Sequence, residues 1–239
     1  MKKGRLILIP SALADSNAAE HFPATSLRAI MPLRHFIAER ARTARRFLRS
    51  IGFDADFDEV KIQELDKHEH DDVDRLLAAC LQGHDVGLLS EAGVPGVADP
   101  GGIIVRAAHR KGVQVHPLIG ASSLLLALMA SGMNGQAFQF QGYLPREEHE
   151  LTKSIKQLEA TSRQQNTSIM FIETPYRNDK TFQALLKHLH PKTDLCLATQ
   201  LTASDESVLT MPVEAWQKRK HVIGKKPTVF LLFSGILES

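Results

Sequence analysis

The order of apolar and polar positions along this chain predicts short buried strands that alternate with helices. Apolar runs such as Arg5–Ile9 and Val86–Leu89 have the length and composition of strands covered on both faces. The segment Arg40–Ile51 places its apolar residues at i, i+3, i+4 and i+7, which is the spacing of one helix face. Repeated strand–helix alternation is typical of an α/β protein with a parallel sheet.

The pattern changes in the second half of the chain. The segment Leu124–Ala130 is apolar on every side, which predicts a buried helix. Later runs at Ser207–Met211 and Pro227–Phe233 have the pattern of antiparallel strands with a helix between them. We therefore expect two α/β domains, residues 1–117 and 118–239, with a ligand cleft where the two domains meet.

A glycine- and proline-rich connection follows the predicted strand Val86–Leu89 and precedes a helical segment. It spans Ser90–Gly102 and holds four glycines and two prolines in thirteen residues. Glycine lets a ligand approach the main chain closely, and ligands of parallel sheets bind at the carboxyl ends of strands. Asp99 before Pro100 predicts the cap of the following helix. We expect this loop to bind a ligand opposite the turn Gly120–Ser123; a tight turn without a ligand is the alternative.

Four arginines share one face of the predicted helix over residues 40–51. They are spaced three or four residues apart: Arg42, Arg45, Arg46 and Arg49. Such a stripe is self-repelling unless anions are near. It is either a solvated surface balanced by the acids between Asp54 and Glu59, or a contact for a nucleic-acid phosphate backbone. A second basic cluster, between Lys218 and Lys226, lies beside a turn, and we interpret it as a solvated loop.

The composition is typical of a soluble globular protein with no strong overall charge. The chain of 239 residues is 43% hydrophobic and 23% charged, with a formal net charge of +2, so any affinity for nucleic acid must come from local patches. Cys80 and Cys196 lie far apart in apolar surroundings, which predicts free buried thiols in a reducing compartment. The apolar run after the basic start is too short for a signal peptide, and no stretch approaches the ~18–20 apolar residues of a membrane span. We expect a cytoplasmic protein without a membrane segment.

Several common site motifs are absent from the sequence. It contains no phosphate-binding loop, no dinucleotide fingerprint and no nucleophile elbow. His68 and His70 stand near acidic residues, but no histidine or cysteine set has the spacing of metal ligands. We expect no required metal, and the glycine-rich loop remains the best candidate for a cofactor site.

The glycine-rich loop resembles a motif of the tetrapyrrole methylase superfamily, whose members are S-adenosylmethionine-dependent methyltransferases. Leu89–Gly101 is similar to the family's Ser-Asp-Ala-Gly-Thr-Pro followed by Asp-Pro-Gly. The similarity continues at Pro117–Ser123, Phe140–Pro145 and Phe171–Arg177, in the same order along the chain. Within the superfamily, the chain is most similar to enzymes that methylate a ribose 2′-hydroxyl in small-subunit ribosomal RNA.

This resemblance implies a fold, a cofactor and partners. It implies two α/β domains with S-adenosylmethionine folded in the cleft between them, usually in a homodimer, and ribosomal RNA or the small ribosomal subunit as the acceptor. The arginine stripe would then be the RNA contact. By the resemblance, the cofactor contacts are Ser90, Glu91, Gly93, Val94, Pro95, Gly120, Ser122 and Ser123, with Phe171, Leu201, Pro227 and Thr228 toward the adenine.

Three functions stay open at this point: ribose methylation of RNA, methylation of a small tetrapyrrole-like molecule or a protein, and cofactor binding without catalysis. The chain departs from the family at its first loop, Pro10–Asp15, which lacks the family's two glycines, and at Arg40, where the family has an aspartate. Glu39 and Glu173 each end a predicted strand and are the candidate catalytic bases, although for each one taken alone an N-cap or an ion pair is the favoured explanation.

Overall fold

A computed structural model describes residues 2–14, 18–65 and 73–236, which divide into two compact units, 1–122 and 123–239. The division falls five residues beyond the boundary expected after Pro117. Two earlier expectations fall outside the described residues: Asp15 of the first loop, and the neighbourhood of His68 and His70.

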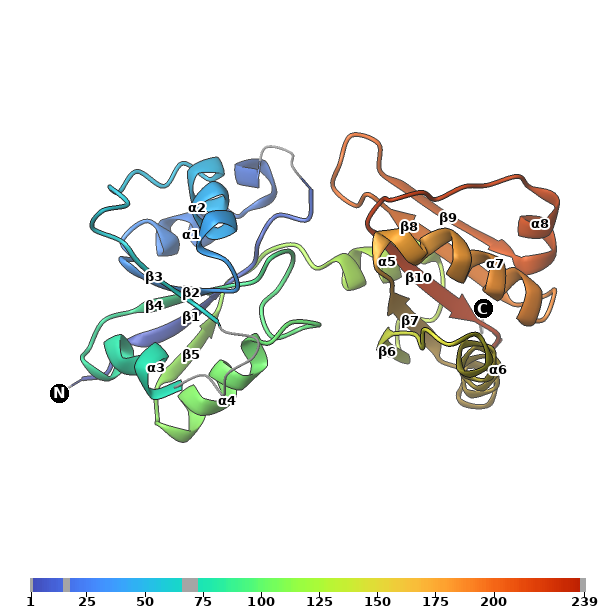
Figure 1. The fold of residues 1–239 in the computed structure, drawn as a ribbon, viewed down its shortest axis with the longest axis horizontal. Coiled ribbons are helices and arrows are strands. Elements are labelled where there is room, and N and C mark those ends of the chain that lie inside the picture. The colour runs from blue at the N-terminus through green and yellow to red at the C-terminus, as the bar shows by residue number, and fades with distance from the viewer. Residues whose placement is uncertain (1, 15–17, 66–72, 237–239) are drawn as a thin grey trace. The chain divides into compact units, whose positions relative to one another are not determined.

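The N-terminal unit is built on a parallel five-stranded sheet in the order β3-β2-β4-β1-β5 (Figure 1). Its strands are β1 (Arg5–Ile9), β2 (His35–Ala38), β3 (Lys61–Glu64), β4 (Val86–Leu89) and β5 (Gln114–Pro117). Its helices are η1 (Ala18–His21), α1 (Ala24–Ile30), α2 (Ala41–Ser50), α3 (Val73–Leu81) and α4 (Gly101–Arg110). The expected parallel α/β arrangement is therefore confirmed.

Helices cover both faces of this sheet, which explains why the inner strands β1 and β4 are apolar without alternation. In β1, Ile7 and Ile9 join the core cluster under α1 and α2, whereas Leu6 joins the cluster under α3 and α4. Position 87 in β4 has room only for glycine, because a Cβ there would lie 2.7 Å from side-chain atoms of both Ile9 and Phe36. The core thus fixes the strands whose carboxyl ends carry the candidate site.

The C-terminal unit has a mixed five-stranded sheet in the order β6-β7-β10-β8-β9. Its strands are β6 (Phe138–Tyr143), β7 (Ser168–Ile172), β8 (Asp194–Thr199), β9 (Ser207–Pro212) and β10 (Thr228–Phe233). Its helices are α5 (Ser123–Ser131), α6 (Glu148–Gln165), η2 (Pro175–Arg177), α7 (Asn178–His188) and α8 (Val213–Lys218). Both β9 and β10 run antiparallel to β8, which confirms the antiparallel pattern expected for the last two strands.

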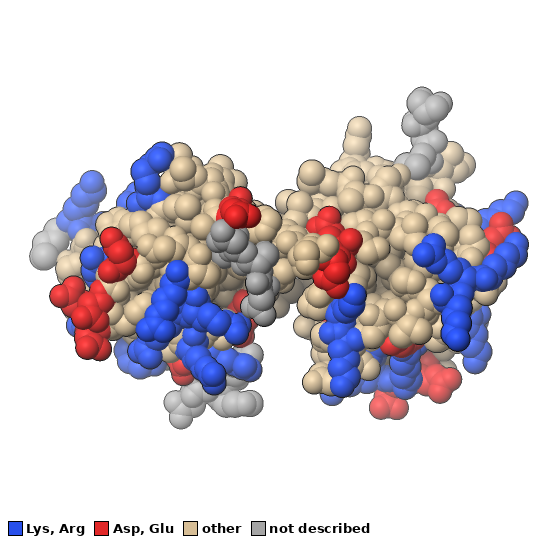
Figure 2. Space-filling model, turned by 90° about the horizontal axis from the view of Figure 1, so that it is seen from above, with Lys and Arg blue, Asp and Glu red and all other residues tan. Residues whose placement is uncertain are grey.

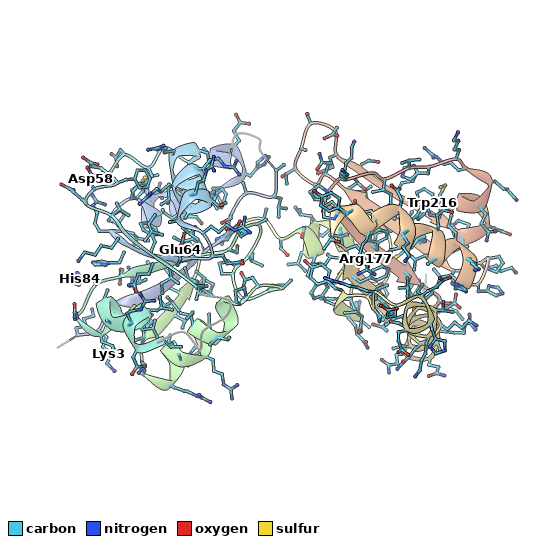
Figure 3. All side chains as sticks on the ribbon, viewed as in Figure 1. Lys3, Asp58, Glu64, His84, Arg177 and Trp216 are labelled. Atoms are coloured by element: carbon cyan, nitrogen blue, oxygen red, sulfur yellow. The ribbon has the colours of Figure 1, made fainter. Side chains whose placement is uncertain are left out.

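The expectation that the apolar helix α5 is wholly buried was wrong. Leu124, Ala127 and Leu128 are buried, but Leu125 and Met129 are 53% and 79% exposed. The sheet covers only one side of a helix, and an apolar composition does not show whether the other side is also covered. The opposite face of the sheet is packed by α6, α7 and α8 around a core that includes Trp216, labelled in Figure 3.

Two further expectations can be compared with the described residues. Cys80 and Cys196 are free and buried, as expected, and burial raises the pKa of each thiol to about 11. Within residues 2–14, 18–65 and 73–236, no helix is long and apolar enough to cross a membrane.

Candidate functional site

The carboxyl ends of the parallel strands bring several distant loops to one edge of the N-terminal sheet. The first loop follows β1, Glu39 follows β2, and the glycine-rich loop follows β4. The turn that contains Gly120 follows β5, which pairs with β1. Because β4 and β5 flank β1 on either side, the glycine-rich loop and the Gly120 turn both lie beside the first loop.

The first loop and the glycine-rich loop are joined by hydrogen bonds. The Ser11 N–H donates to the Gly93 carbonyl oxygen at 2.8 Å, and the Gly93 N–H donates to the Ser11 carbonyl oxygen at 3.1 Å. The buried Ser11 hydroxyl donates to the Ser90 carbonyl oxygen at 2.7 Å. The Ser90 hydroxyl in turn donates to the Gly93 carbonyl oxygen at 2.7 Å. These bonds fix the main chain of both loops, so their shape is set before any ligand binds.

Asp99 closes the glycine-rich loop on itself. Its Oδ1 accepts the N–H groups of Gly96 and Gly101 at 2.7 and 2.8 Å. The N-cap position of α4 is Pro100, one residue later than expected, although the Asp99 carboxylate still accepts the N–H of Gly101, the first residue of the helix. Burial raises the pKa of the Asp99 carboxyl, and the negative charge of Glu39 raises it further.

Glycine is required where the loops turn or approach each other. Gly93 and Gly96 have φ of 73° and 82°, which L side chains rarely adopt. At Gly120 a Cβ would lie 2.5 Å from Cβ of Pro10, so only glycine lets this turn lie against the first loop. The structure thus joins the glycine-rich loop and the Gly120 turn through Pro10 and Ser11, and sequence reasoning had assigned no role to Ser11.

The helix with the arginine stripe begins at this same edge. Glu64, at the end of β3, accepts the Ala41 N–H at 2.6 Å and so caps the start of α2 (Figure 3). The Thr43 hydroxyl donates to Oε2 of Glu91 at 3.3 Å, which ties the first turn of α2 to the glycine-rich loop. Carboxylates at a helix N-terminus also interact favourably with the helix dipole.

The arginine stripe is an exposed face of α2 beside a surface hollow of about 530 Å³. Its described lining residues are Arg42, Thr43, Arg45, Arg46 and Arg49. Lys and Arg side chains gather on this side of the unit (Figure 2). Among the described residues, no ion pair joins Arg42, Arg45 or Arg49 to a carboxylate, and the Arg49 guanidinium lies 5.1 Å from the ring centre of Phe57. The charges of Arg42, Arg45 and Arg49 are therefore available to an anionic partner.

In the C-terminal unit, most of the residues expected near the adenine lie where β8 ends and β10 begins. Thr228 begins β10 and its hydroxyl lies 3.2 Å from that of Thr199, at the end of β8. Pro227 is exposed, and Leu201 is 8% exposed in the turn after β8. Phe171 differs from these because its ring is fully buried and stacks on Phe230 at 5.3 Å, so its side chain is part of the core.

Glu173 is the centre of a buried polar cluster. Its carboxylate, which is 0% exposed, lies 3.2 Å from the Arg177 guanidinium and accepts the Thr181 hydroxyl at 3.1 Å. Arg177, labelled in Figure 3, also donates to the carbonyl oxygens of Leu144 and Pro145. The ion-pair alternative therefore explains Glu173. Glu39, half-buried at the end of β2, remains the candidate base.

The edge of the N-terminal sheet has the kinds of groups that a sulfonium nucleoside needs. The main chain at Gly102 is open, with nothing within 4 Å of where a Cβ would project, and the nearest atoms at Gly96 are main-chain atoms of Gly102 at 3.9 Å. Val94 is half-buried, and Glu91 offers a carboxylate that faces Thr43 rather than an ion-pair partner. Open main chain, apolar surface and carboxylates together suit a cationic ligand that carries hydroxyls. Ser122 and Ser123 are half-buried where α5 begins.

Comparisons with known proteins identify a matching family model and named relatives. Residues 18–216 match the model of the Tetrapyrrole (Corrin/Porphyrin) Methylases. The chain is 25% identical over 229 residues to "Ribosomal RNA small subunit methyltransferase I" of Halalkalibacterium halodurans, covering 93% of this chain and 74% of the relative. Proteins of the same name from Micromonospora olivasterospora and Escherichia coli O157:H7 are 32% and 27% identical, over 86% and 90% of this chain and 62% and 73% of theirs.

Solved structures show the same fold. The methyltransferase CobJ superposes with a TM-score of 0.61 at 16% identity, covering 96% of this chain and 94% of that structure. Uroporphyrin-III-C-methyltransferase from Thermus thermophilus superposes with a TM-score of 0.58 at 18% identity, covering 98% of this chain and 93% of that structure.

Proposed function

The chain belongs to the tetrapyrrole methylase family, and we propose that it transfers the methyl group of S-adenosylmethionine to a ribose 2′-hydroxyl of small-subunit ribosomal RNA. The family uses S-adenosylmethionine as its methyl donor. The observation that carries the choice of acceptor is similarity over 86–93% of the chain to relatives named for small-subunit ribosomal RNA. The exposed arginine stripe on α2 supports the same choice, because RNA is a polyanion.

The residues proposed to hold the methyl donor come from the loops described above. In the N-terminal unit they are Ser90, Glu91, Gly93, Val94, Pro95, Gly120 and Ser122. In the C-terminal unit they are Ser123, Leu201, Pro227 and Thr228, with Phe171 limited to its main chain because its ring is buried. The fixed bonds between Ser11, Ser90 and Gly93 support this assignment, since a preorganised loop loses little conformational freedom on binding.

When bound, the methyl donor supplies a carbon that is already activated by a positively charged sulfur. The task left to the protein is to hold the ribose oxygen in line with that carbon and to accept its proton. Glu39 is the proposed proton acceptor, since it directly follows β2 at the same end of the sheet as the glycine-rich loop, and its negative charge contributes to the raised pKa of Asp99. The arginine stripe would position the strand through phosphate contacts and would read no base.

The resemblance also supports a homodimer. Light scattering would then give twice the chain mass of 26.5 kDa.

Two measurements test the proposal. Titration calorimetry with S-adenosylhomocysteine, the demethylated product, tests the methyl-donor site directly. Transfer of labelled methyl groups is then compared between purified small ribosomal subunits and tetrapyrrole acceptors. Labelled ribose in the subunits supports the proposal, whereas labelled tetrapyrrole, or binding of the nucleoside without transfer to any acceptor, contradicts it.

A further inference from the structure

A surface segment of the C-terminal unit, Ile223–Thr228, is held by four hydrogen bonds to two adjacent side chains. Asp179 accepts the N–H groups of the segment's first two residues at 2.8 and 3.1 Å. The amide of Asn178 donates to the carbonyl oxygens of Gly224 and Lys226 at 3.1 and 2.7 Å. Two adjacent side chains at the start of α7 therefore fix the main chain of a segment that is exposed at three of its six positions.

The side chain of Asn178 is buried with one polar atom unpaired within the described part of the chain, which lowers the stability of the fold. It is 0% exposed, and its Oδ1 has no hydrogen-bond partner among the described residues. An unpaired buried acceptor is destabilising, so packing alone does not explain an asparagine at this position.

The same segment is held from its other side by the turn that follows β8. The Gln200 N–H donates to the Pro227 carbonyl oxygen at 2.9 Å. The Lys226 ammonium pairs with Asp205 at 2.8 Å. The segment is thus held both by the start of α7 and by the turn that follows β8.

This turn is itself strained. Gln200 and Thr202 have φ of 55° and 70°, and a β-branched residue such as threonine rarely adopts such a conformation. The strain is held in place by Glu206, whose carboxylate accepts the Thr202 N–H at 2.6 Å, and by the bond from the Ala203 N–H to the Gln200 carbonyl oxygen at 2.9 Å. Strained backbone of this kind persists only where the surroundings fix it, and it is concentrated at ligand sites.

We propose that Asn178, Asp179 and the strained Gln200–Glu206 turn are positioning elements that preorganise the Ile223–Thr228 segment for binding the methyl donor. This inference rests on the proposed function, in which Leu201, Pro227 and Thr228 contact the nucleoside. None of the positioning residues touches the reacting atoms. They raise affinity because the segment and the turn need no further ordering when the ligand binds.

The test compares affinity with stability in the full chain. Titration calorimetry gives the Kd of S-adenosylhomocysteine, and urea unfolding gives the stability, for the wild type and three variants. Asn178→Ala removes both donor bonds to the segment. Thr202→Gly relieves the strain of the turn without removing its bonds. Asn134→Ala is the matched control. Like Asn178, Asn134 forms hydrogen bonds to main-chain groups, in its case three, but it precedes β6 and lies at the other end of the strands from Thr228.

Asn178→Ala is expected to weaken binding about tenfold, and Thr202→Gly about threefold, because each leaves part of the site to be ordered by the ligand. Thr202→Gly is expected to keep or raise the urea midpoint, since glycine adopts a positive φ without strain. Asn134→Ala is expected to lose stability and keep the wild-type Kd. If Asn178→Ala does not fold, Thr202→Gly still decides the question.

Two results overturn the inference. The first is a wild-type Kd in both Asn178→Ala and Thr202→Gly. The second is an affinity loss that follows the stability loss in all three variants, which indicates a purely structural role. A wild-type chain that binds no S-adenosylhomocysteine overturns the proposed function itself, and this inference with it.

Discussion

The arginine stripe on α2 leads to a quantitative prediction for RNA binding. Arg42 and Arg45 are the two residues to replace, because both are exposed and neither pairs with a carboxylate among the described residues. Glutamine removes the charge and keeps a polar side chain that can still donate hydrogen bonds, although a shorter one. The double variant Arg42→Gln/Arg45→Gln therefore tests phosphate contacts and leaves the apolar face of α2 intact.

The magnitude follows from the release of counterions from RNA. Each phosphate contact with a single strand contributes about 0.7 to the slope of log affinity against log salt concentration, so the three arginines without a described carboxylate partner, Arg42, Arg45 and Arg49, contribute about 2.1. A rise from about 50 to 200 mM salt should then weaken wild-type binding about eighteenfold, but weaken that of the double variant only about threefold.

The assay is fluorescence anisotropy of a labelled fragment of small-subunit ribosomal RNA at several salt concentrations. The control is Lys153→Gln/Lys156→Gln, which removes the same charge from two exposed positions of α6 with the same spacing. Two outcomes refute the argument: a wild-type slope in the arginine variant, or an equal fall of slope in the lysine control, which indicates that only net charge matters.

Three further predictions concern stability. Gly120→Ala places a Cβ 2.5 Å from Cβ of Pro10, so we expect a loss of about 1–3 kcal/mol in urea unfolding; an unchanged midpoint would show that the turn moves freely. Glu173→Gln leaves the Arg177 charge without its buried partner and should cost about 2–3 kcal/mol, because that guanidinium retains some exposure; a loss below about 0.5 kcal/mol contradicts the assigned role. Burial raises the pKa of both cysteine thiols from 9.0 to about 11, so the unfolded chain releases these protons first. This stabilisation is complete below pH 9 and disappears as the pH rises to about 11, so the urea midpoint should fall over that range more steeply than in a variant with both cysteines replaced by alanine.

Local patterns in the sequence were sufficient to predict most of the elements. The helix α2 lies within a residue of each expected end because its apolar face repeats with the helical period and a glycine follows it. The helix α1 was missed, since it has only seven residues and a weak apolar pattern between two prolines. The burial of α5 was overestimated because composition does not show how much of a helix its neighbours cover.

The sequence predicted the loops of the candidate site but not the hydrogen bonds that join them. The glycine-rich loop was recognisable from its composition, whereas the bonds of Ser11 to Ser90 and Gly93 depend on β1 lying beside β4, some eighty positions away in the chain. Asn178 gave no signal in the sequence, because an asparagine at a helix start usually caps that helix and here it holds a different segment.

The most direct test of the account is a map of 2′-O-methylated riboses in small-subunit ribosomal RNA from cells with and without this gene. The account predicts that one methylated ribose is lost without the gene and returns when the wild-type chain is supplied. An identical map in both cells would contradict the proposed acceptor.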